Sequence, residues 1–62
     1  MSTMPSEDFE AAYETLAMAI DSAGTEREAL FLTRLALVLA NELGDIVAFK
    51  EAVRTALEGL AD

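Results

Sequence analysis

The sequence predicts an all-α protein built from three short helices, and three observations support this fold class. Apolar residues recur at helical spacing in three separate stretches of the 62-residue chain. Gly24 and Gly44 divide these stretches, and glycine commonly follows the last residue of a helix. No alternating run of apolar and polar residues between turn residues indicates a strand. We therefore expect a small three-helix unit, consisting of a helical hairpin with one further helix packed on it.

The first helix is expected over residues 7–23, after a flexible tail at residues 1–5. Ser6 is suited to the N-cap position, because its hydroxyl can accept a hydrogen bond from a free backbone N–H of the first turn. Residues 6–62 are expected to form a single domain. The apolar residues that share one face of this helix are Phe9, Tyr13, Leu16 and Ile20.

The second and third helices are expected over residues 26–43 and 46–60. Thr25 and Glu28 have the spacing of a capping box at the start of the second helix. Asp45 follows Gly44 directly and is suited to cap the third helix. The apolar positions of the third helix recur at helical spacing and are Ile46, Phe49, Val53, Ala56, Leu57 and Leu60.

The second helix is apolar on almost every side. When its residues are placed at helical spacing, Leu30 and Leu37 lie roughly opposite Leu39. A helix of this kind is normally buried on most sides, and two short neighbours cover only part of it. We therefore expect the chain to form a homo-oligomer or to be buried in a larger protein. The alternative is a compact monomer in which the other two helices wrap the second one.

A narrow polar strip on the second helix is a candidate protein-binding surface. Arg27, Arg34 and Asn41 are spaced seven residues apart, and Leu30 and Leu37 lie beside them. Arginine is enriched among the residues that dominate binding energy at interfaces, so Arg34 is the expected central anchor. The alternative is a solvated edge whose arginines pair with carboxylates of the first helix, where exposed pairs contribute little.

The negative charge of the chain is concentrated in its first helix. Four basic residues stand against twelve acidic residues, which gives a net charge of -8. Residues 1–24 contain five acidic residues and no basic residue. Glu10 and Glu14 are like charges one helical turn apart, which is slightly unfavourable unless a cation lies nearby. They are candidate contacts for a partner with a basic surface, or else they form a solvated face that keeps the chain soluble.

Composition also excludes several function classes. The shortage of basic residues argues against binding to nucleic acid or to an anionic membrane. The longest apolar run covers only residues 35–40, whereas a membrane span needs about 18 residues. Cysteine and histidine are absent, and no glycine-rich phosphate loop is present. We therefore expect a cytoplasmic protein that is not an enzyme and holds no metal or cofactor.

The segment from Arg34 to Asp45 resembles a known pattern. It contains an arginine, a leucine-rich run, and then Ala40-Asn41 and Gly44-Asp45. In this order of residues it is similar to a family of short, uncharacterised bacterial helical proteins. Genes of that family often lie beside flavin-dependent aromatic hydroxylases. The resemblance implies no activity, but it implies a small accessory subunit of an enzyme of aromatic degradation.

Two functions follow from these features. The first is a non-catalytic protein-interaction module or accessory subunit, which binds a larger enzyme through the second helix and the acidic face of the first. The second is a helical homo-oligomer whose apolar interior holds a small hydrophobic ligand.

Overall fold

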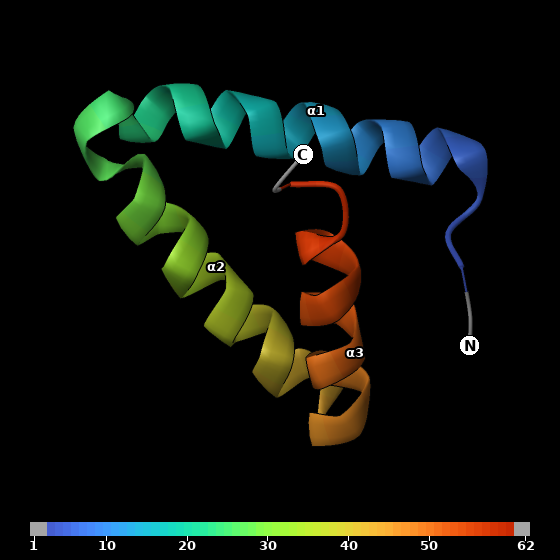
Figure 1. Ribbon diagram of the computed structural model, residues 1–62. Helices are drawn as coiled ribbons and strands as arrows, with labels where there is room; N and C mark the ends of the chain where they lie inside the picture. The colour runs from blue at the N-terminus through green and yellow to red at the C-terminus, as the bar shows by residue number, and fades with distance from the viewer. Residues whose placement is uncertain (1–2, 61–62) are drawn as a thin grey trace. The chain divides into compact units, whose positions relative to one another are not determined.

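The computed structural model describes residues 3–60, and these residues form three α-helices and one short 3₁₀ helix (Figure 1). Their bounds are α1 Ser6–Ala23, η1 Thr25–Arg27, α2 Glu28–Leu43 and α3 Ile46–Leu57. No strand occurs within residues 3–60, so the predicted all-α class is confirmed. Of the expected tail, residues 1–2 lie outside the described residues, and residues 3–5 belong to no helix.

The chain divides within α2 into two compact units. The first unit comprises residues 1–32, with α1, η1 and the start of α2. The second unit comprises residues 33–62, with the rest of α2 and all of α3. The expectation of a single domain over residues 6–62 stays a prediction.

Helix α1 begins one residue earlier than the sequence predicts. Pro5, and not Ser6, is its N-cap residue, and no side chain caps this end. The Pro5 backbone has φ -56° and ψ 153°, and its carbonyl accepts a hydrogen bond from the amide of Phe9 at 2.9 Å. Proline fixes φ near the helical value, so Ser6 is already the first helical residue.

The connection from α1 to α2 contains a 3₁₀ turn in place of the predicted capping box. Gly24 has φ 81° and ψ 161°, a combination that is essentially restricted to glycine, and its amide donates to the Ile20 carbonyl at 3.1 Å. The amide of Arg27 then donates to the Gly24 carbonyl, three residues back, which makes residues 25–27 a 3₁₀ turn. No amide of residues 25–43 donates a hydrogen bond to the Thr25 side chain, so the predicted capping box is wrong, and α2 begins at Glu28 rather than at residue 26.

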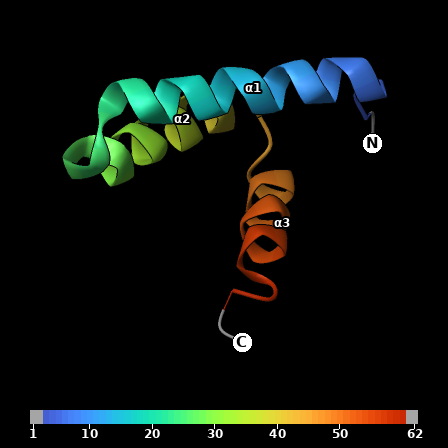
Figure 2. The same cartoon turned by 90° about the horizontal axis from the view of Figure 1, so that it is seen from above.

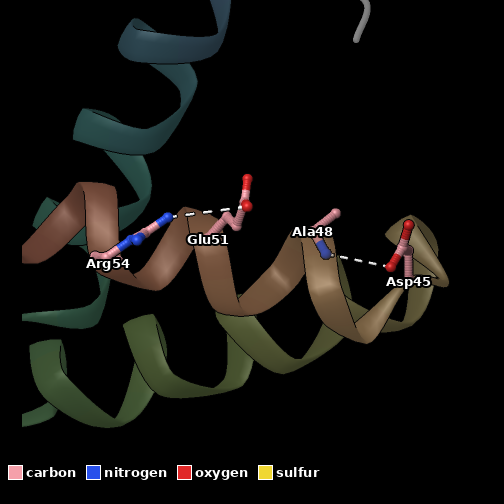
Figure 3. A network of polar contacts seen from close by, with 4 residues as sticks. All are labelled: Asp45, Ala48, Glu51 and Arg54. Carbon is pink, nitrogen blue, oxygen red and sulfur yellow. Dashed lines mark hydrogen bonds and ion pairs between the residues drawn. The ribbon is translucent and has the colours of Figure 1, made fainter.

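The connection from α2 to α3 follows the prediction closely. Gly44 has φ 68°, and its amide donates to the Ala40 carbonyl at 3.0 Å, which ends α2. The carboxylate of Asp45 then accepts hydrogen bonds from the amides of Val47 at 3.0 Å and Ala48 at 3.2 Å. Figure 2 shows this connection as a short extended segment that leads directly into α3, and Figure 3 shows Asp45 at the start of that helix. The predicted N-cap is confirmed.

Replacing Asp45 with alanine is expected to lower the free energy of unfolding by about 1 kcal/mol, because two amides of α3 lose their acceptor. Urea unfolding followed by circular dichroism at one fixed protein concentration measures this loss. The matched control is Asp45→Asn, which keeps an acceptor oxygen and should lose only a few tenths of a kcal/mol. Equal losses in the two variants would contradict a capping role.

Helix α3 is shorter than predicted. It ends at Leu57, and residues 58–60 form a turn in which Gly59 has φ 81°. The amide of Glu58 donates to the carbonyls of Arg54 and Thr55, and its own ψ of 131° is no longer helical. Glycine is a poor helix former, so the last turn expected up to residue 60 does not continue.

No side chain in residues 3–60 is fully buried. In the first unit the half-buried residues surround the contact of α1 with η1, and they are Leu16, Ala19, Ile20, Ala23, Gly24, Phe31 and Leu32. In the second unit they are Leu35, Ala40, Ala48 and Phe49. Each unit therefore has a small cluster of half-buried apolar residues, but most of its large apolar side chains are exposed.

Candidate protein-binding surfaces

One face of α1 combines aromatic and acidic side chains, and we call it the acidic–aromatic face. Phe9, Glu10, Tyr13 and Glu14 line an open hollow of about 550 Å³. Phe9 is 64% exposed and Tyr13 is 70% exposed. Phe9 and Tyr13 share the predicted apolar face with Leu16 and Ile20, but only Leu16 and Ile20 are half-buried.

This arrangement suits a cationic side chain of a partner protein. Glu10 and Glu14 lie one helical turn apart, and so do Phe9 and Tyr13. Carboxylates bind guanidinium and ammonium groups through charge-assisted hydrogen bonds, and aromatic rings attract the same groups through their π-faces. Sequence reasoning found the two acids but missed the aromatic pair, although the interleaved spacing of the two pairs was a usable signal.

The outer strip of α2 contains Leu30, Arg34, Leu37 and Asn41, and all four residues are exposed. Their spacing of four, three and four residues places them along one side of a continuous α-helix. Arg34 forms no ion pair with any described residue of its own unit, residues 33–60. The strip thus combines two exposed leucines with an exposed arginine.

Arg27 lies outside this helix. It is the last residue of the 3₁₀ turn η1, whereas the prediction placed it on the second helix. Arg27 is exposed, and its place beside Arg34 on one surface stays a prediction.

An apolar groove lies between α2 and α3 within the second unit. Its volume is about 260 Å³. The residues that line it are Ala36, Leu39 and Leu43 from α2, and Phe49, Ala52, Val53 and Ala56 from α3. Pockets for small molecules are typically larger, about 300–1,000 Å³, and contain a few polar groups that orient the ligand. Among residues 33–60 the groove lining contains no polar side chain, which favours contact with another apolar helix over a small ligand.

The opposite face of α3 is polar. Val47, Lys50, Glu51 and Arg54 line a shallow open hollow there. A guanidinium nitrogen of Arg54 lies 3.9 Å from a carboxylate oxygen of Glu51, and both side chains are well exposed (Figure 3). Such an exposed pair contributes little to stability, so this face has the character of a solvated surface.

The second unit is short of buried apolar surface. Leu39 is 54% exposed, Leu43 is 51% exposed and Val53 is 43% exposed, although all three line the groove. Full burial of such a side chain contributes about 1.5–3 kcal/mol relative to full exposure, so roughly half of that gain is still missing at each position. Another polypeptide that covers the groove would supply it.

Residues 3–60 contain neither a metal-binding cluster nor a membrane-spanning helix. No group of three or more potential metal-ligating side chains is found in residues 3–60. None of the helices in this part of the chain is long and apolar enough to cross a membrane. No protein-family model, no curated protein and no solved structure matches the chain.

Proposed function

We propose that the chain is a non-catalytic protein-interaction module, a small accessory subunit that docks on a larger protein. The observation that carries this proposal is the exposure of large apolar side chains beside charged ones on α1 and α2. Exposed apolar patches bordered by polar residues commonly mark protein–protein interaction sites.

The acidic–aromatic face of α1 indicates a partner with a basic surface. The first unit has seven acidic residues and one basic residue, a net charge of -6, against -2 for the second unit with five acidic and three basic residues. Complementary charge increases the rate of encounter and selects the partner. Phe9 and Tyr13 add apolar contact area next to those charges.

The outer strip of α2 has the pattern of a helix that docks into a groove of another protein. Such helices use anchors at positions i, i+4 and i+7, which here are Leu30, Arg34 and Leu37. Arg34 combines a long aliphatic stem with a fixed charge, and arginine is a frequent hot-spot residue. The resemblance of residues 34–45 to proteins encoded beside aromatic hydroxylases makes an enzyme of aromatic degradation the first partner to test.

Replacing Arg34 with glutamate is expected to abolish capture of the partner and to leave the helix content unchanged, because an exposed side chain reverses its charge. The tagged chain is used to isolate a partner from the organism that encodes it, and the pair is then reconstituted from purified proteins. The matched control is Lys50→Glu, which makes the same change of charge on the polar face of α3.

The proposal requires that the two variants differ in their binding to the partner. Lys50→Glu should bind within about threefold of the unmodified chain, since surface changes away from an interface have small effects. If Arg34→Glu reconstitutes equally well, Arg34 is not part of the docking surface. If no larger protein is isolated with the unmodified chain, the accessory-subunit proposal fails.

A further inference from the structure

We propose that a second copy of this chain covers the groove between α2 and α3, and that the two copies form a twofold-symmetric homodimer. The inference goes beyond the docking function, which uses the acidic–aromatic face and the outer strip instead. Three properties of the second unit support it: the shape of the groove lining, its charge and the extent of its uncovered surface.

The groove lining is self-complementary in side-chain size. Small residues at Ala36, Ala52 and Ala56 alternate with large ones at Leu39, Leu43, Phe49 and Val53. A twofold interface brings the same patch of both copies together, so a patch needs both knobs and holes to pack against itself. Alanine at helix contact positions also allows a second helix to approach closely. A partner with a uniformly large or uniformly small surface would leave part of this lining unfilled.

Charge permits self-association at the second unit and opposes it at the first. No charged side chain of residues 33–60 lines the groove, and the second unit has a net charge of only -2. The first unit has a net charge of -6, so two copies that met through α1 would repel each other. The residues that line the groove include none of α1 and none of the outer strip of α2.

The second unit leaves large apolar side chains uncovered along the groove, where a second copy would cover them. The large exposed side chains that line the groove or follow its helical stripe are Leu39, Leu43, Ile46, Val53 and Leu57.

Leu39 and Leu37 provide a matched pair of variants. They are two residues apart on α2, with 54% and 63% exposure, but Leu39 lines the groove and Leu37 lies on the outer strip. Sedimentation equilibrium of the full chain should show twice the 6.7 kDa of one chain. Leu39→Asp should weaken the dimer by about 100-fold or more, because association would bury a charge, whereas Leu37→Asp should change it by less than about threefold.

A second measurement does not depend on the folding of Leu39→Asp. The chain has no cysteine, so a single introduced thiol reports one position. Alkylation of Ala52→Cys, in the groove, should be about tenfold slower in concentrated than in dilute protein, since the dimer covers the thiol. Alkylation of Val47→Cys, on the polar face of α3, should have the same rate at both concentrations.

The dimer is overturned by a monomer at all concentrations, by three or more chains in the assembly, or by an Ala52→Cys thiol whose reactivity is independent of concentration. Dissociation by Leu37→Asp but not by Leu39→Asp would also overturn it. These failures are distinct from failure of the proposed function. A monomer can still capture a larger protein through Arg34, and a dimer can still fail to capture one.

Discussion

Replacing Phe49 with alanine is expected to lower the free energy of unfolding of the associated protein by about 3–5 kcal/mol, the loss typical of a buried phenylalanine. Phe49 is half-buried within one chain and lines the groove, where a second copy would cover the rest of its ring. Chemical unfolding at a concentration where the chain is dimeric measures the loss.

The matched control is Val47→Ala, on the same helix two residues earlier. Val47 is 65% exposed and belongs to the polar face of α3, so its loss should stay within about 0.5 kcal/mol. A loss of about 1.5 kcal/mol or less for Phe49→Ala would mean that its ring stays half-exposed in solution, which contradicts a covered groove.

Reversing both charges of the acidic–aromatic face, with Glu10→Lys and Glu14→Lys together, is expected to weaken binding of the larger partner by about 100-fold or more, or about 2.7 kcal/mol. Two lysines would place like charges opposite the basic surface that we expect on the partner, and such contacts cost several kcal/mol. Titration calorimetry with the reconstituted pair measures the affinity.

The control for net charge is the double variant Glu42→Lys and Glu58→Lys. It raises the net charge from -8 to -4, as the first pair does, but both changes lie in the second unit. Its affinity should stay within about fivefold of the unmodified chain, because only non-specific attraction changes. Equal losses in the two double variants would show that total charge, and not the α1 face, determines binding.

The helices and their connections could largely be predicted because local chemistry determines them. Asp45 caps α3 as expected, since the side chain of an N-cap aspartate reaches the free backbone amides of the first helical turn. Gly24 and Gly44 end helices because both adopt positive φ. The prediction of Ser6 as N-cap failed because Pro5 already had the required backbone, and the capping box at Thr25 failed because a 3₁₀ turn formed there.

The binding surfaces were harder to predict because helical spacing shows which residues share a face but not whether anything covers that face. Phe9 and Leu16 belong to one apolar stripe of α1, yet Phe9 is exposed and Leu16 is half-buried. Arg27 was expected on the second helix with Arg34, but it lies in the 3₁₀ turn, and whether the two share a surface stays a prediction. The prediction that the second helix needs cover from another chain rested on composition and stays a prediction, although Leu30 and Leu37 are exposed.

The central claim is that another polypeptide completes the apolar core of this chain, and that in the isolated protein a second copy does so. Thermal unfolding of the pure chain, followed by circular dichroism from about 1 to 500 µM, tests this most directly, because association makes the midpoint depend on concentration. We predict a single transition whose midpoint rises steadily with concentration. A midpoint that is the same at every concentration would show that one chain folds stably alone, and it would contradict the claim.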